Sequence, residues 1–440
     1  ASFKVSGNSV VKSAKAATVN ATGEVSVKQS SMMEVGAIDF DPANPDAIPT
    51  MRGAPAALTV NAGTFEVSGT AAVGATGAAT VTTTGADTAG NGITVQGGAR
   101  LASKGAMQLS ANGAGAVLVA NDAKVAGGST VTVTGATGVT VDGSTAAASV
   151  ESVENLTVTA TTGDLVAKGA AKLGTDGVLK LEAADDAGSV KLQDGAVASA
   201  KKNVDIDAGK DVTVEKSRVW AKGKDVAAGT AAVDITAGGG ILVQGGGTLA
   251  TKATVEAGDI DFSYDPGTKA ISAAPKAGSA VANVSLTAGG DVTVENTAAV
   301  GATGTATVRA SGENGVTVRN TAALASEGNM TVTASKTGAG SVLADNDAVV
   351  AANGTMTLDA AKDVKVTKGS KVESKENLTV LAKGDVLVGG ADAAAGSARL
   401  STSGELRVGS KSDGVSETVQ PVASFKVSGN SVVKSAKAAT

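Results

Sequence analysis

The stretch GGDVTVEN (289–296), together with the run NVSLTA (283–288) before it, decides the fold of this chain. Val292 and Val294 are two residues apart, so both side chains point to one face of a β-strand while the residues between and beside them point to the other face. The run at 283–288 alternates in the same way. The glycine pair between the two runs, which includes Gly290, indicates a corner. The stretch therefore predicts a strand, a corner and a second strand.

Close copies of this unit recur along most of the sequence. The first strand type appears as ALTVNA (57–62), TVTVTG (130–135), NLTVTA (155–160) and SARLST (397–402), and the second type appears as GVTV (138–141), GDLVA (163–167), GDVTV (290–294) and GELRV (404–408). From Val292, the leading apolar residue of the second type recurs at Val316, Val342, Val364, Val386 and Leu406. The period is therefore about 20 to 26 residues, which is typical of a repeat architecture.

Short strands at this period favour one architecture over its rivals. A leucine-rich repeat would need a Leu and Asn ladder with a helical arm, and a propeller blade would need about twice the period. Each strand here resembles the strand one period away, and like strands stack most simply in parallel. We therefore predict an all-β fold, a right-handed parallel β-helix of about 18–20 coils that forms a rod near 90 Å long. The number of faces per coil is left open.

Two proline-containing segments interrupt the rhythm, and we expect them to be loops outside the helical rod. They cover residues 37–50 and 259–275, and both contain an Ile-Asp-Phe triplet. We accordingly interpret 1–440 as a single rod with sub-blocks 1–210 and 211–440 that arose by internal duplication. The sequence ASFKVSGNSVVKSAKAAT also occupies both 1–18 and 423–440. Tandem repetition of a longer block or an artificial continuation of the repeat would each produce these identical ends.

Composition excludes several classes of function. The chain has no Cys and no His, which removes disulfides, thiolate or imidazole metal sites and Ser–His or Cys–His nucleophiles. The net charge of −5 predicts no general affinity for nucleic acid, and no apolar run is long enough for membrane insertion. A single Trp and a single Tyr are few for a sugar-cleaving groove. We expect no enzyme activity, no cofactor and no bound metal. We also interpret the sequence as a mature chain or an internal fragment.

Two sets of residues stand out as candidate sites. Asn155, Asn283, Asn329 and Asn377 each precede an inward apolar residue, and we interpret them as corners that tolerate left-handed dihedrals and bond to neighbouring backbone; several also fit the glycan acceptor pattern. The segment 201–224 carries the densest positive charge, and stacked coils could align Lys216, Arg218, Lys222 and Lys224 as contacts for a sulfated glycan. A solvated charged face is the simpler interpretation.

The units ENLTVTATTGDLVAKG (154–169), AGGDVTVENTAAV (288–300) and ENLTVLAKGDVLVGG (376–390) resemble the long repeat region of the filamentous haemagglutinins, which are two-partner-secretion adhesins. The resemblance covers essentially the whole chain. It implies a parallel β-helix, export through an outer-membrane secretion partner, and display at the bacterial cell surface as a monomeric rod. It also implies that the full-length fibre contacts host-cell surface receptors or sulfated glycans. The family's Arg-Gly-Asp triplet is missing, because Ala54 follows Arg52-Gly53.

Overall fold

The computed structural model describes residues 1–39, 50–223, 226, 230–265, 270–276, 279–389, 397–412, 417–419 and 421–440. The chain divides into two compact units, Ala1–Gly209 (unit 1) and Lys210–Thr440 (unit 2). In the described part of both units the structure is almost entirely β, and a single turn of 3₁₀-helix, η1 (Leu249–Thr251), is the exception. No helix in the described ranges is long and apolar enough to cross a bilayer.

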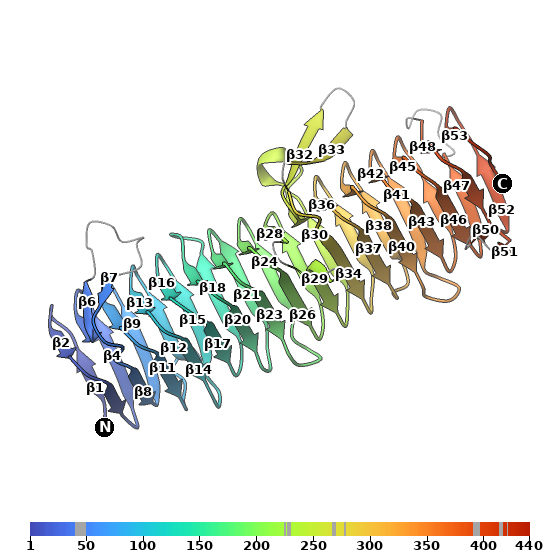
Figure 1. Ribbon diagram of the computed structural model, residues 1–440. Coiled ribbons are helices and arrows are strands. Elements are labelled where there is room, and N and C mark those ends of the chain that lie inside the picture. Colours follow the sequence, from blue (N-terminus) through green and yellow to red (C-terminus); the bar gives the residue numbers. More distant parts are fainter. Residues whose placement is uncertain are drawn as a thin grey trace. The chain divides into compact units, whose positions relative to one another are not determined.

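Unit 1 contains three parallel sheets, which we call the first, second and third sheets (Figure 1). In the first sheet the order is β1 (Phe3–Val5), β4 (Glu24–Lys28), β9 (Thr64–Ser68), β12 (Asn91–Gln96), β15 (Ala116–Ala120), β18 (Val139–Gly143), β21 (Leu165–Gly169) and β24 (Val190–Gln193). In the second sheet it is β2 (Val10–Ser13), β5 (Met32–Val35), β10 (Ala72–Ala75), β13 (Arg100–Ser103), β16 (Lys124–Gly127), β19 (Ser149–Ser152), β22 (Lys172–Thr175) and β25 (Val197–Ala200). In the third sheet it is β3 (Ala17–Asn20), β8 (Leu58–Ala62), β11 (Ala79–Thr83), β14 (Met107–Ala111), β17 (Val131–Gly135), β20 (Leu156–Ala160), β23 (Leu179–Ala183) and β26 (Val204–Ala208).

Unit 2 repeats the three-sheet arrangement. Its first-sheet strands are β27 (Val212–Glu215), β30 (Ile241–Gln244), β35 (Val292–Glu295), β38 (Gly315–Arg319), β41 (Ser341–Asp345), β44 (Val364–Val366), β47 (Asp385–Val388) and β52 (Ser424–Val427). Its second-sheet strands are β28 (Arg218–Ala221), β31 (Thr254–Ala257), β36 (Ala299–Ala302), β39 (Ala323–Ser326), β42 (Val349–Ala352), β45 (Lys371–Ser374), β48 (Arg399–Thr402) and β53 (Val432–Ser435). Its third-sheet strands are β29 (Ala231–Ala237), β34 (Asn283–Ala288), β37 (Ala306–Ala310), β40 (Met330–Ala334), β43 (Met356–Ala360), β46 (Leu378–Ala382) and β49 (Leu406–Val408).

Each unit is therefore a three-sided β-solenoid, which confirms the predicted parallel β-helix. The register partners include the predicted steps from Val292 to Val316 and from Val364 to Val386. The right-handed sense and the length of a rod stay predictions.

Two details of the prediction were wrong. The described part contains eight complete coils in unit 1 and seven in unit 2, fewer than the predicted 18–20. Some coils are much longer than the repeat period, because Val25 pairs with Phe65 across an inserted segment. In addition, two segments were assigned to the wrong strand type. Other strands of the first type lie in the third sheet, but SARLST lies in the second sheet; other strands of the second type lie in the first sheet, but GELRV lies in the third sheet. Leu406 therefore pairs with Leu378 and does not continue the series from Val386.

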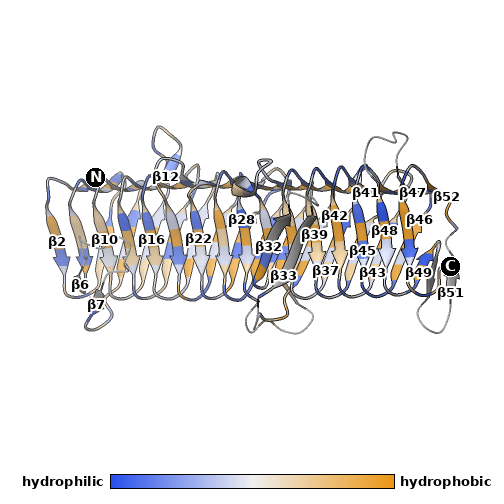
Figure 2. Cartoon of the chain, turned by 90° about the horizontal axis from the view of Figure 1, so that it is seen from above, coloured by the Kyte–Doolittle hydropathy of each residue, from blue (hydrophilic) through white to orange (hydrophobic). Residues whose placement is uncertain are grey.

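The core of each unit is a set of apolar columns running from coil to coil. Apolar and polar residues alternate along the strands (Figure 2), and the inward ones stack on their register partners. Val139, Leu165 and Val190 form one such column, and each is 1% or less exposed. Burying one side chain of this size contributes about 1.5–3 kcal/mol. Because the columns repeat, each coil obtains its burial from the coils directly before and after it.

Antiparallel hairpins leave the coils at the two segments predicted to be loops. In unit 1, β6 (Ala37–Asp39) pairs with β7 (Thr50–Arg52). In unit 2, β32 (Ile260–Asp265) pairs with β33 (Ala270–Pro275). A third hairpin, in which β50 (Ser410–Ser412) pairs with β51 (Glu417–Val419), lies outside the two predicted loops and follows the third-sheet strand β49. Both β6 and β32 follow a strand of the second sheet. Residues 40–49 and 266–269 of the predicted loops lie outside the described residues.

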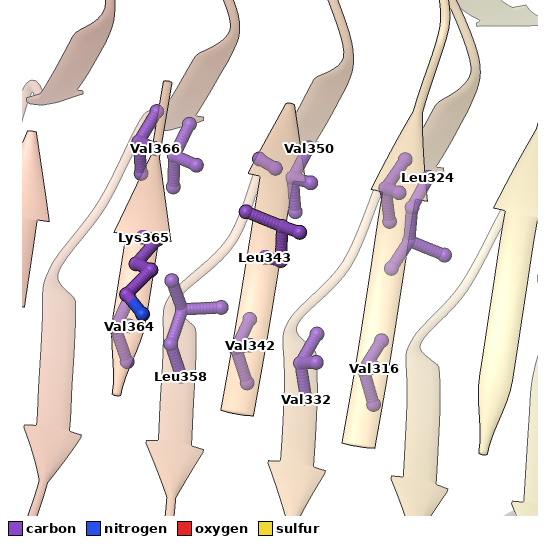
Figure 3. Close-up of a pocket in the computed structure, with 13 residues that line it drawn as sticks. Val316, Leu324, Val332, Val342, Leu343, Val350, Leu358, Val364, Lys365 and Val366 are labelled. Carbon is purple, nitrogen blue, oxygen red and sulfur yellow. The ribbon is translucent and has the colours of Figure 1, made fainter. Parts of the chain in front are cut away.

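The apolar column of unit 2 contains a small void. Ala344 stands between Val318 and Val366 in the first sheet, and it lines a void of about 10 Å³ together with residues such as Val342, Val350 and Val364 (Figure 3). A valine at this position would continue the column on both sides. The void therefore lies where the side chain that one coil contributes to the core is too small to fill the space.

We predict that Ala344→Val raises the free energy of unfolding by about 0.5–2 kcal/mol, because it fills a void without moving its neighbours. Ala167→Val is the matched control, since Ala167 is also buried in a first sheet but stands between Val141 and the larger Leu192. That change should overpack the column and cost about 1–3 kcal/mol. Denaturant unfolding measures both. Equal losses in the two variants would contradict this account.

Candidate functional site

The four predicted corner asparagines make the same hydrogen bond in both units. Each Oδ1 accepts a hydrogen bond from a backbone N–H at the entrance to the third-sheet strand of the next coil, at Val178 (3.0 Å), Thr305 (2.8 Å), Thr355 (2.9 Å) and Glu405 (2.9 Å) for Asn155, Asn283, Asn329 and Asn377, respectively. A side chain in one coil therefore satisfies a backbone donor in the next.

Aspartates make the equivalent bond at the corner that leads into the first sheet. Asp164 Oδ1 accepts from Ser189 N at 2.9 Å, and Asp363 Oδ1 accepts from Asp385 N at 2.8 Å. Gly290 lies at this corner between β34 and β35, and its N–H donates to the carbonyl of Gly239 at 2.7 Å. At the corners that carry these side chains, Asn precedes a third-sheet strand and Asp precedes a first-sheet strand.

The glycines beside these corners are required by close approach. A Cβ added to Gly304 would lie 2.3 Å from Asn283 Oδ1, and a Cβ at Gly354 would lie 2.3 Å from Asn329 Oδ1. An asparagine in one coil therefore demands a glycine in the next. Sequence reasoning identified the four asparagines as corners, but it did not connect them with these glycines.

The left-handed backbone conformation occurs at a different corner. The four corner asparagines do not have positive φ, whereas Asn296, Asn320 and Asn346 have φ between 54° and 57°. The Nδ2 of Asn320 donates to Asn296 Oδ1 at 2.9 Å, and the Nδ2 of Asn346 donates to Asn320 Oδ1 at 2.8 Å. These three residues form an amide ladder between the first and second sheets of unit 2. The ladder links three successive coils through their side-chain amides.

The described basic residues of the candidate glycan contact form ion pairs with acidic neighbours. Lys216 Nζ lies 3.3 Å from Glu215, and Lys222 Nζ lies 3.8 Å from Asp259. The Arg218 guanidinium lies 2.7 Å from Glu256 and stands over the Trp220 ring at 5.1 Å. Lys224 lies outside the described residues. These contacts hold each described base close to the solenoid.

Buried glutamates lie near the start of the β6–β7 and β32–β33 hairpins. Glu34 on β5 is 6% exposed and pairs with Lys12, and Glu256 on β31 is 3% exposed and pairs with Arg218. The Trp220 indole N–H also donates to the Gly258 carbonyl at 3.2 Å. A buried carboxylate that keeps its cation avoids the large cost of an uncompensated charge.

A threonine fastens the returning chain after each of these hairpins. Thr76 Oγ1 accepts from Ala56 N and donates to Ala54 O, and Thr303 Oγ1 accepts from Ala282 N and donates to Ala280 O. Gly36 and Gly258 leave the space that each threonine occupies, since a Cβ there would lie 2.0 and 2.2 Å from the respective Oγ1. The β6–β7 hairpin of unit 1 and the β32–β33 hairpin of unit 2 are therefore followed by the same threonine–glycine contact.

Sequence reasoning missed a groove on the outer face of the second sheet in unit 2. It has a volume of about 270 Å³ and is lined by residues that include Lys375, Arg399 and Lys434. The lining comes from four coils separated by 22 to 33 residues in register, so no short motif marks it. Within the described part of the chain, no three acidic side chains gather as they would around a metal ion.

An ionic cluster on the first sheet of unit 1 shifts two pKa values. Glu24 lies 2.6 Å from Lys4 and 3.1 Å from Lys28, and Lys28 lies 2.5 Å from Glu66. The hydrogen bond from Lys4 lowers the pKa of Glu24, which burial opposes and Lys28 reinforces. The hydrogen bond to Glu66 raises the pKa of Lys28, which burial opposes and Glu24 reinforces.

We predict that the stability contributed by Glu24 is present above its unfolded pKa, near 4.3, and is lost as the pH falls through its lower folded pKa. Glu24→Gln should therefore cost less than about 1 kcal/mol at neutral pH and almost nothing in acid, because the cluster is partly exposed. Denaturant unfolding at several pH values measures the difference. A difference between variant and parent that grows in acid would contradict the prediction.

We predict that Asn283→Ala and Gly304→Ala each destabilise unit 2 by about 1 kcal/mol or more, through a lost hydrogen bond and a steric clash, respectively. The double variant should cost less than the sum, because removing the asparagine side chain removes the atom that an alanine at 304 would strike. A double-mutant cycle from unfolding free energies tests this coupling. Strictly additive losses would show that the two residues act independently.

Comparison of the chain with protein-family models, with curated proteins and with solved structures found no match.

Proposed function

We propose that this chain is part of the structural shaft of a secreted, surface-displayed filamentous adhesin that mediates bacterial attachment to host cells. The proposal rests on the β-solenoid architecture of both units together with the sequence resemblance to filamentous haemagglutinin repeats. A shaft needs a repetitive element that separates a binding end from an anchored end, and stacked coils provide one.

The observation that carries the proposal is that coils are joined by the same short-range interactions along each unit. The backbone ladders, apolar columns and Asn or Asp corners all link a coil to the coil beside it. A disulfide-free chain of this kind can emerge unfolded through an outer-membrane secretion partner and then fold coil by coil. Each new coil completes on the one already formed.

The alternative function, a glycosaminoglycan-binding module at 201–224, receives less support. A sulfated glycan would have to displace Glu256 from Arg218 and Asp259 from Lys222. Glu256 is buried, so losing its partner would leave an uncompensated charge. The ion pairs favour a structural role for these bases.

The proposal is tested by removing one whole coil from the full-length, surface-displayed protein. Deleting Val131–Asn155 joins Thr130 to Leu156, which is the register partner of Val131, so all three sheets can close again. We expect normal export and attachment of cells to host cells, because a shaft tolerates a change in length. Attachment is counted by microscopy and display by surface immunolabelling.

Deleting only Val131–Gly138 is the matched control. It places the first-sheet strand β18 where a third-sheet strand belongs, and every later strand is displaced by one sheet. Display should fall sharply, because the displaced strands cannot pair in register. If the whole-coil deletion were displayed normally but no longer supported attachment, this coil would hold a specific binding site and the shaft proposal would be wrong.

A further inference from the structure

The groove on the second sheet of unit 2 has a floor formed by one register column, in which the small residues Ala351 and Ser401 alternate with the charged residues Glu373 and Lys434. Ala351, Glu373, Ser401 and Lys434 succeed one another on strands β42, β45, β48 and β53. Four strands at ~4.8 Å spacing span about 14 Å, which is the length of about four residues of an extended peptide. The groove thus has the length of a short strand laid across the coils.

In other coils, the same register column is already covered by extended polypeptide from this chain. In unit 2 it begins at Trp220 and passes through Glu256 to Gly301 and Ala325, where the hairpin strands β32 and β33 lie against β36 and β39. Unit 1 repeats this arrangement, with Ile38 of β6 packed on Ala72 and Ala102 of the second sheet. Small residues on this outer face therefore receive extended polypeptide in both units.

The charge around the groove is positive. Arg399 Nε lies 3.0 Å from Glu373 and 3.1 Å from Ser401 Oγ, so one cation is balanced by one anion. Lys375 and Lys434 are exposed, and neither has an acidic partner among the described residues. The lining of the groove contributes two uncompensated positive charges and several hydroxyl groups, and the described lining contains no aromatic ring on which a sugar could stack.

We propose that this groove binds an extended acidic peptide segment of a partner protein, laid over Ala351 and Ser401 with its carboxylates at Lys375 and Lys434. Ala351 is the register partner of Ala325 and so continues the column of small residues on which the chain's own hairpin lies, which favours polypeptide over saccharide. The two lysines favour carboxylates over neutral side chains. This proposal goes beyond a shaft, because it gives one face of unit 2 a specific partner chemistry.

The test is fluorescence anisotropy with a labelled peptide of alternating Glu and Ser, and with a Gln–Ser peptide of the same length as the uncharged probe. The full chain should bind the acidic peptide, and the Gln–Ser peptide should bind much more weakly. Lys375→Ser combined with Lys434→Ser should weaken binding about fivefold, as expected for the loss of two partly exposed ion pairs. Added salt should weaken binding further.

Two further variants distinguish binding in the groove from non-specific attraction by positive charge. Lys104→Ser with Lys202→Ser removes the same charge from exposed positions of unit 1 and should leave the affinity unchanged. Ala351→Gln keeps every charge but obstructs the floor, and it should abolish binding while the thermal midpoint stays the same. Equal weakening by both lysine pairs, or full binding by Ala351→Gln, would overturn the proposal.

Competition and sedimentation experiments test the two other possible ligands of the groove, a polysaccharide and a second copy of the chain. An unlabelled carboxylated polysaccharide that bound the groove more tightly than the acidic peptide would show that the site is saccharide-specific and would overturn the proposal. Sedimentation of the unlabelled chain tests for a second copy as occupant. Self-association that disappears in Ala351→Gln would assign the groove to contacts between copies and would equally overturn it.

Discussion

Backbone hydrogen bonding between successive coils is the interaction on which the rest of each unit depends. A strand in a parallel sheet leaves its amide and carbonyl groups unsatisfied unless its neighbour lies in register. The corners have the same requirement, and the Asn and Asp side chains meet it by reaching into the next coil. Asn155 and Asp164 illustrate this within a single coil, because each accepts from a backbone donor of the coil that follows. The apolar columns then fill a lumen whose shape these bonds have already set.

This constraint also explains where the chain can depart from the repeat. A hairpin can be inserted at a corner, provided that the strands on either side still reach their register partners. The β6–β7 hairpin in unit 1 and the β32–β33 hairpin in unit 2 both follow a second-sheet strand, and Thr76 and Thr303 fasten the chain that returns. A buried glutamate with a cationic partner lies near each of these two insertions. The second sheet thus accommodates additional polypeptide in both units, while the further hairpin β50–β51 of unit 2 follows the third-sheet strand β49. The groove near Ala351 continues the face of the second sheet.

The sequence predicted much of the fold but little of the candidate site. Val292 and Val294 alternate clearly, and their copies one period away revealed the first and third sheets. The second sheet was harder to recognise, because strands such as β16 carry one buried valine among Ala, Gly and Lys. Leu406 was placed in the wrong sheet because it continues the 20-residue spacing while belonging to the third sheet. The corner hydrogen bonds and the groove both depend on residues in different coils, so neither leaves a contiguous motif.

The measurement that tests the account most directly is the proximity of residues one coil apart. The chain contains no cysteine, so nitroxide labels can be attached to Thr132→Cys and Thr157→Cys alone. These positions are register partners on adjacent third-sheet strands, and their labels should show strong dipolar broadening in electron paramagnetic resonance spectra. A pair at Thr140→Cys and Thr157→Cys joins different sheets and should show much less. Absent broadening in the first pair would contradict the in-register stacking on which the whole account rests.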